Sequence, residues 1–141
     1  MTVKQLSVFL ENRSGRLTDV LETLGAENIN ITSLTVADTS EYGILRLIVS
    51  DAEKALQLLK SNGFSAGLTE VIALSIPHQV GSLAKILKTL SDNQLSIEYI
   101  YAFCLGDKAI VVLRTDHRAK AFEIITNNHF TPVSENDIKN M

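Results

Sequence analysis

The sequence is poor in the residue types that mark several common classes of protein. Of its 141 residues, one is a cysteine, two are prolines and none is a tryptophan. A single cysteine excludes an intramolecular disulfide, so the chain suits a reducing compartment. The scarcity of proline, together with 45% hydrophobic and 21% charged residues, excludes a disordered or fibrous chain.

An excess of positive charge and long apolar runs are also missing. The 13 Lys and Arg residues are outnumbered by 16 Asp and Glu, which gives a net charge of −3 at pH 7. Without a basic surface, neither nucleic acid nor an anionic membrane is expected as a partner. The apolar runs are far shorter than the roughly 18 residues that a membrane helix needs, and the first residues lack a secretory pattern. We therefore expect a cytoplasmic, non-membrane protein.

Motifs for catalysis and metal binding are likewise absent. The three histidines lack the HxxxH and HExxH spacings of zinc sites, and CxxC, GxGxxG and phosphate-loop motifs do not occur. The central strands expected in each half have no aromatic residue to stack on RNA bases. The sequence therefore predicts no catalytic residue, no metal site and no cofactor. Cys104 is expected as a packed strand residue, with a place in a pocket wall as the alternative.

What the sequence does contain is one pattern written twice. Aligning Gly15 with Gly81, an offset of 66 residues, brings the apolar positions of the two halves into register. The matching pairs include Leu6/Ile72, Val8/Leu74, Leu10/Ile76, Leu17/Leu83, Leu21/Leu87 and Leu24/Leu90. We predict two domains, 1–69 and 70–141, with almost no linker between them.

Each half alternates the hydrophobic periods of strands and helices. In the first half, residues 6–10 have the period of two of a half-buried strand, and residues 17–24 mark one face of a helix. Strands at 28–37, 44–49 and 64–68 and a second helix at 51–60 follow. Ser14 and Asp51 are the expected helix N-caps, and Gly25 the expected end of the first helix.

The resulting order is βαββαβ, the ferredoxin-like arrangement of an antiparallel sheet with both helices on one face. One unit of about 70 residues is marginally stable by itself, and its edge strands need cover. The predicted fold class is therefore α+β, with two ferredoxin-like units whose antiparallel sheets pack side by side.

The most informative segment of each half is the loop between its first strand and its first helix. Polar residues are followed by a glycine and then by an amphipathic helix. A glycine lets a ligand approach the backbone closely, and the free N–H groups of a helix N-terminus bind carboxylates. The structural alternative is a tight turn at each glycine, with solvent-exposed side chains at Arg13, Arg16 and His78.

These loops resemble the signature of ACT domains, small βαββαβ regulatory modules that bind amino acids. The resemblance is carried by Asn-Arg-Ser-Gly-Arg-Leu at 12–17 with Asn-Ile-Asn-Ile at 28–31, and by residues 78–83 with Gln-Leu-Ser-Ile at 94–97. In the family, an acidic or amide residue stands three positions before the glycine, and proline often precedes the glycine. Ser14 and Val80 replace that proline here, and His78 replaces the acidic or amide residue.

The resemblance implies an amino-acid site where two ACT domains meet, between the loop of one and the start of the second strand of the other. Carried over residue by residue, it implies a ligand-binding set of Asn12, Arg13, Ser14, Gly15, Arg16, Leu17, Asn30, His78, Gln79, Val80, Gly81, Ser82, Leu83 and Ser96.

The function implied is that of a free-standing tandem ACT protein that is not an enzyme. It would sense a free amino acid and transmit binding to a partner metabolic enzyme or to its own oligomeric state, and a homodimer is expected. Two alternatives stay open at this point. One is an assembly module whose loops are empty, and the other is a small acylphosphatase-like enzyme, against which stands the lack of a partner base at a readable spacing.

Overall fold

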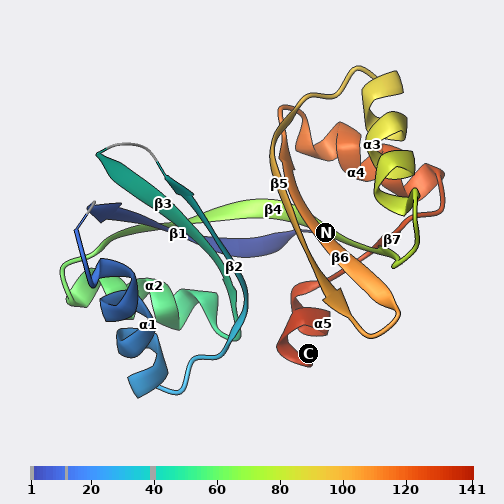
Figure 1. The fold of residues 1–141 in the computed structure, drawn as a ribbon. Coiled ribbons are helices and arrows are strands. Elements are labelled where there is room, and N and C mark those ends of the chain that lie inside the picture. Colours follow the sequence, from blue (N-terminus) through green and yellow to red (C-terminus); the bar gives the residue numbers. More distant parts are fainter. Residues whose placement is uncertain (1, 12, 39–40) are drawn as a thin grey trace. The chain divides into compact units, whose positions relative to one another are not determined.

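The chain folds as two successive βαββαβ repeats (Figure 1). The computed structural model describes residues 2–11, 13–38 and 41–141. The chain divides into two compact units. The first-repeat unit comprises Lys4–Glu70 with Asn136–Met141, and the second-repeat unit comprises Val71–Glu135 with Met1–Val3. The predicted α+β class with two βαββαβ units is confirmed, and the domain limits 1–69 and 70–141 stay a prediction.

The first repeat forms an antiparallel sheet covered on one face by two helices. Its elements are β1 (Val3–Glu11), α1 (Arg16–Ala26), β2 (Ile31–Asp38), β3 (Tyr42–Val49), α2 (Ala52–Ser61) and the start of β4 (Ser65–Pro77). The strand order is β2-β3-β1-β4, and α1 and α2 lie side by side on the same face of the sheet (Figure 1). β4 is longer than the short strand predicted at 64–68, because it continues into the second repeat.

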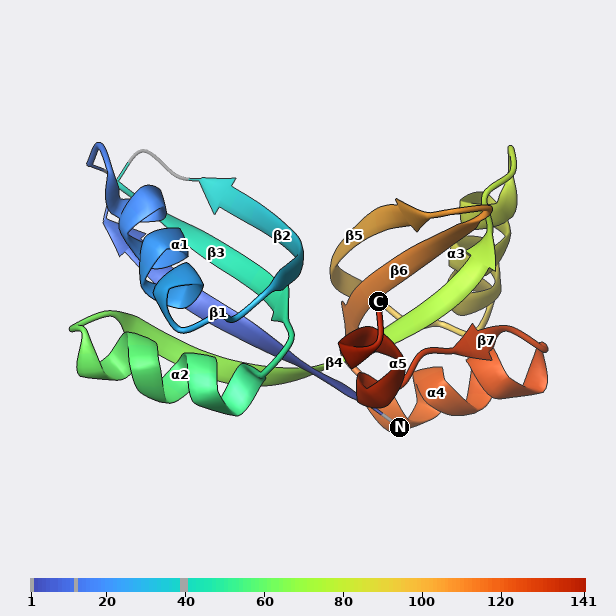
Figure 2. The ribbon, with the colours of Figure 1, turned by 90° about the horizontal axis from the view of Figure 1, so that it is seen from below.

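The second repeat has the same topology. After β4 come α3 (Ser82–Asp92), β5 (Ile97–Leu105), β6 (Lys108–Thr115), α4 (Arg118–Asn127), the two-residue β7 (Thr131–Pro132) and α5 (Glu135–Lys139). The strand order is β5-β6-β4, with β7 on the other side of β4, and α3 and α4 pack together (Figure 2). In the described part of the chain, no helix is long and apolar enough to cross a membrane.

Each unit has a hydrophobic core between its sheet and its helices. The first core contains Leu6, Val8, Leu10, Val20, Leu24, Ile29, Leu45, Leu47, Val49, Ala55, Leu59 and Phe64. The second contains Ile72, Leu74, Ile76, Ile86, Leu90, Leu95, Val111, Leu113, Ala121, Ile124 and Ile125. Strand residues of period two and helix residues of period 3.6 meet in both cores, as the apolar pattern predicts.

The four long helices all end in the same way. The residue after each C-cap has a positive φ, between 60° and 82°, and these residues are Asn28, Gly63, Gln94 and His129. In α1, the N–H of Asn28 donates to Gly25 O at 3.0 Å and the N–H of Ile29 to Leu24 O at 3.1 Å, which is a Schellman motif. The prediction that α1 ends at Gly25 is therefore wrong, because the left-handed residue is Asn28.

The helix starts follow two patterns. Asp51 is the N-cap of α2, as predicted, and its Oδ1 accepts a hydrogen bond from the backbone N–H of Lys54 at 3.1 Å. The prediction for Ser14 is wrong. The N-cap of α1 is Gly15, with a φ of 88° and no side-chain capping bond, because the tight turn out of β1 requires a left-handed residue there. Gly81, with a φ of 87°, is its counterpart at α3.

One buried position distinguishes the two cores and gives a stability prediction. Thr115 is 7% exposed, and its Oγ1 has no hydrogen-bond partner among the described residues. Its counterpart in the first core is Val49. A buried polar group without a partner costs about 1 to 3 kcal/mol, and an apolar group of the same shape removes that cost. We expect Thr115→Val to raise the free energy of unfolding by about 1 kcal/mol, measured by urea denaturation.

The matched control for this prediction is the reverse change at the equivalent position. Val49→Thr places a hydroxyl in the first core and should lower the free energy of unfolding by about 1 to 3 kcal/mol. A destabilising Thr115→Val substitution would show instead that the threonine hydroxyl is well solvated or bonded in the folded protein.

Candidate functional site

The loop between the first strand and the first helix is built in the same way in both units. In the first repeat, the N–H of Arg13 donates to Glu11 O at 2.8 Å, and the N–H of Asp19 to Gly15 O at 2.9 Å. The second repeat makes the equivalent bonds, from Gln79 N–H to Pro77 O at 2.9 Å and from Lys85 N–H to Gly81 O at 3.0 Å. Both loops therefore turn the chain over the end of the sheet and start a helix at the same place.

A cavity lies beside each of these loops. The first-repeat cavity has a volume of about 170 Å³ and is lined by Leu10, Glu11, Arg13, Arg16, Leu17, Val36 and Gly43. The second-repeat cavity has a volume of about 290 Å³ and is lined by Ile76, Pro77, His78, Gln79, Ser82, Leu83, Ala102, Phe103, Cys104, Ala109 and Val111. Every residue of the first set has its counterpart, 66 positions later, in the second set. The two cavities are thus equivalent places in the repeated fold.

The structure brings about half of the predicted site residues to these cavities. Those that line a cavity are Arg13, Arg16, Leu17, His78, Gln79, Ser82 and Leu83. Four others, Ser14, Gly15, Val80 and Gly81, lie exposed in the two loops without lining a cavity. Asn12 lies outside the described residues. All of these assignments as ligand-binding residues remain predictions.

Asn30 and Ser96 lie at the other end of their own sheets. The N–H of Asn30 donates to Ser50 Oγ at 3.0 Å, and the N–H of Ser96 donates to Asp116 Oδ1 at 3.1 Å. Ser50 follows the end of β3, whereas the loop after β1 lies where β3 starts, because Glu11 pairs with Tyr42. Neither residue therefore reaches the cavity of its own unit, and a role for them across two domains stays a prediction.

The sequence analysis missed the cavity residues that come from the neighbouring strands. Val36 and Gly43 reach the first cavity from β2 and β3, and Ala102 and Ala109 reach the second from β5 and β6. These residues are distant from the loops in sequence. The signal that could have found them is the βαββαβ strand order itself, which places the end of the second strand and the start of the third beside the first loop.

Cys104 also lines the second cavity, so the expectation of a packed strand residue is wrong. The residue is exposed on β5, and its Sγ lies 3.6 Å from Nδ1 and 3.8 Å from Nε2 of His78. Cys104 pairs with Ala109, which pairs with the core residue Ile76, so the cysteine side chain lies on the face of the sheet that bears the cavity. In the described residues, no three His, Cys, Asp or Glu side chains are grouped to hold a metal ion.

The first cavity is bordered by charged side chains. The guanidinium of Arg16 lies 4.4 Å from the centre of the Phe64 ring, and its Nη1 lies 3.5 Å from Asp19 Oδ2. Arg13 Nε lies 3.9 Å from Glu11 Oε2, and both side chains are exposed. The exposed pair of Arg13 and Glu11 contributes about 0 to 1 kcal/mol to stability, so these two charges are available to a ligand. The side chain of Arg16 is only 18% exposed and packs against Phe64.

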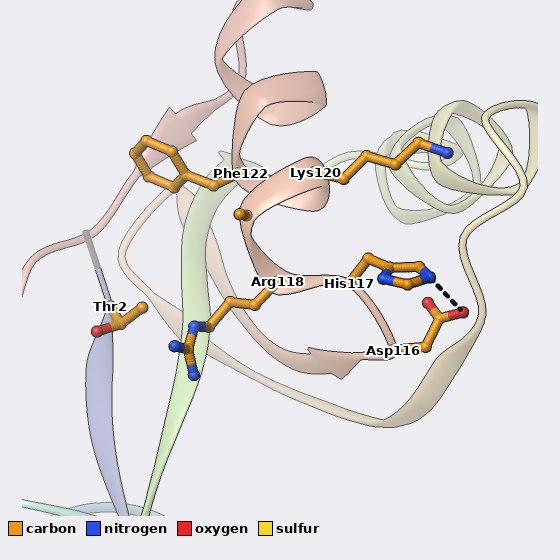
Figure 3. A pocket seen from close by; sticks show the side chains of 7 residues that line it. Thr2, Asp116, His117, Arg118, Lys120 and Phe122 are labelled. Carbon is orange, nitrogen blue, oxygen red and sulfur yellow. Dashed lines mark ion pairs between the residues drawn. The ribbon is translucent and has the colours of Figure 1, made fainter.

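A third, more open cavity of about 840 Å³ lies at the start of α4 in the second-repeat unit (Figure 3). His117 Nε2 lies 4.0 Å from Asp116 Oδ2, and Lys120 Nζ donates to Asn93 O at 2.9 Å. In Figure 3, Lys120 and Phe122 extend to opposite sides of the helix. The sequence analysis did not predict this cavity. Of the polar groups named here, Lys120 and Asp116 each bond to a backbone group of the protein, Asp116 through the N–H of Ser96.

Two βαββαβ units with an equivalent cavity beside each first loop define a tandem ferredoxin-like protein. The family model of the ACT domain pair matches residues 1–141, so the chain belongs to the ACT domain pair family. The resemblance noted in the sequence is thereby confirmed. The chain is related to regulatory domains that bind amino acids, and ACT domains are regulatory rather than catalytic.

Solved structures share this fold. Protein BT0572 from Bacteroides thetaiotaomicron is 42% identical, with a TM-score of 0.95 over 100% of this chain and 98% of that one. The ligand-free regulatory subunit of aspartate kinase from Thermus thermophilus is 18% identical, with a TM-score of 0.66 over 89% and 92% of the two chains. The corresponding subunit from Thermus flavus is 19% identical, with a TM-score of 0.61 over 88% and 90%. No curated protein matches the chain in sequence.

The loop glycine makes a testable difference to stability. A Cβ on Gly15 would meet no atom within 4 Å, so the cost of Gly15→Ala comes from the φ of 88° alone. That cost is about 1 to 2 kcal/mol for a left-handed residue with a Cβ. Gly25, inside α1, also has open space around its Cβ position but no positive φ, so Gly25→Ala should stabilise by about 0.5 to 1 kcal/mol. Urea denaturation of both variants measures the contrast, and equal effects of the two substitutions would contradict it.

Proposed function

We propose that this protein binds free amino acids in its two loop cavities and transmits binding to a partner enzyme or to its own oligomeric state. The observation that carries the proposal is the same cavity, beside a left-handed glycine and a helix N-terminus, in both units of an ACT domain pair. The proposed setting is the cytoplasm, and the proposed role is regulatory without catalysis.

The chemistry of the cavities supports an amino acid as the ligand. The first N–H groups of a helix lack partners within it, and they favour a carboxylate there. An ammonium acceptor is present beside each helix start, as the Glu11 carboxylate in the first cavity and the Gln79 side-chain carbonyl in the second. Volumes of about 170 and 290 Å³ lie at or below the lower end of the range of about 300 to 1,000 Å³ for ligand pockets. Such spaces suit a single small metabolite.

Regulation then follows from linkage. A ligand shifts a conformational or assembly equilibrium only through its different affinities for the two states. If the amino acid stabilises the form that binds a partner enzyme, the enzyme must increase the affinity for the amino acid by the same factor. A homodimer of the chain would be coupled to the amino acid in the same way. The affinity for the amino acid, measured with and without the partner enzyme or across the monomer–dimer equilibrium, gives the coupling in each case.

The proposal is tested by the thermal stability of the full chain with each of the twenty amino acids. A ligand at 100 times its Kd should raise the free energy of unfolding by about 2.7 kcal/mol. If no amino acid raises the melting temperature, the chain is an assembly module with empty cavities, and the proposal is wrong.

Two matched double variants locate the binding. Leu17 and Leu83 line the cavities from the first turn of α1 and α3, and both are exposed. Leu17→Asp with Leu83→Asp should abolish the ligand-dependent shift, because the new carboxylates repel the carboxylate of the ligand. Thr18→Asp with Ala84→Asp makes the same charge change one residue further along, outside both cavities, and should retain the shift. Asp is favourable in a first helical turn, so both proteins should fold.

A further inference from the structure

We infer that the second-repeat cavity selects amino acids with an apolar side chain and that the first-repeat cavity does not bind them. This inference rests on the proposed function and names the class of ligand for one of its two sites. It depends on two differences between cavities that occupy equivalent places, charge and size, and on the apolar floor of the second cavity.

The difference in charge arises at three equivalent positions. Glu11, Arg13 and Arg16 border the first cavity, and the second has Pro77, Gln79 and Ser82 in their places. The second set therefore has no formal charge, and the cavity has no partner for a charged ligand side chain except through His78. Leaving such a charge without a partner beside apolar groups is costly, so a charged side chain is disfavoured in the second cavity.

The difference in size goes with one of these replacements and with a further one on the second strand of each repeat. Ser82 is smaller than Arg16, and Ala102 is smaller than Val36, so the volume rises from about 170 to about 290 Å³. The larger cavity also extends to Val111, which is fully buried in the second core and whose counterpart Leu45 does not line the first cavity. An apolar side chain placed there leaves water and contacts the core itself.

The floor of the second cavity is apolar because of the strand register. Ala102 pairs with Val111, and Ala109 pairs with both Ile76 and Cys104, so these side chains lie on the same face of the sheet. Polar side chains come from the loop and the start of α3, at His78, Gln79 and Ser82. An amino acid bound with its charged backbone groups at the loop and helix therefore directs its side chain over an apolar floor.

The experiment uses Cys104, the only cysteine of the chain, as a reporter inside the second cavity. The full-length protein is alkylated with iodoacetamide in the presence of L-leucine, L-phenylalanine, L-aspartate or L-lysine. We expect L-leucine or L-phenylalanine, at 100 times its Kd, to slow the alkylation of Cys104 at least about tenfold by occupying the cavity. L-Aspartate and L-lysine should leave the rate unchanged.

Variants that recreate the first cavity test the cause of the selectivity. Ser82→Arg introduces the equivalent of Arg16, and Phe130 already stands at the place of the Phe64 ring that Arg16 covers. This variant should lose the protection by apolar amino acids, whereas Ala84→Arg, which adds the same charge at an exposed position outside the cavity, should keep it. Gln79→Arg, in the exposed loop, makes the same test if Ser82→Arg does not fold.

The possible failures are distinguishable. Protection of Cys104 by L-aspartate or L-lysine, but not by apolar amino acids, would overturn the inference and leave the proposed function standing. A rise in melting temperature with L-leucine or L-phenylalanine, without protection of Cys104, would place apolar binding elsewhere and would also overturn it. If none of the twenty amino acids protects Cys104 or raises the melting temperature, the inference and the proposed function fail together.

Discussion

The tight connection from the first strand to the first helix is the constraint on which each unit depends. Four residues separate Glu11 from Arg16, and four separate Pro77 from Ser82. Within this length the chain must leave the sheet, reverse over its end and start a helix that packs on one face. A left-handed residue makes the reversal possible, and both repeats place a glycine there. The same reversal leaves the start of the helix above the sheet, where each cavity lies.

The apolar pattern was sufficient to predict the repeat and the order of the elements, because burial imposes a different period on strands and helices. It was not sufficient for the helix ends. Asn28, Gln94 and His129 take the left-handed conformation in which glycine is commonest, and only Gly63 fits that preference. The position of each helix end is set by the residue that follows the left-handed one. Ile29 and Leu95 must return to the core, and the Schellman bonds follow from that return.

The candidate site could be predicted in part, for a related reason. A loop motif is local in sequence, so the sequence pattern alone predicted the site positions from Arg13 to Leu17. The walls that β2, β3, β5 and β6 supply were not, because strand pairing brings them to the loop. Asn30 was included in the predicted ligand-binding set because the chain resembles a family in which two domains share a site. Within its own unit, that residue is bonded to Ser50, beyond the opposite end of β3.

The two repeats differ most where a difference costs least. Of the buried positions in the first core, all but Val49 have an apolar counterpart in the second repeat, and a large-to-small change at such a position costs about 2 to 5 kcal/mol. Exposed positions such as Glu11, Arg13 and Gln79 tolerate substitution within about 0.5 kcal/mol. The core therefore keeps the glycine turn and the helix start in place, while the exposed residues that border each cavity are free to change their charge. Two cavities at equivalent places can then differ in charge and size without any change of fold.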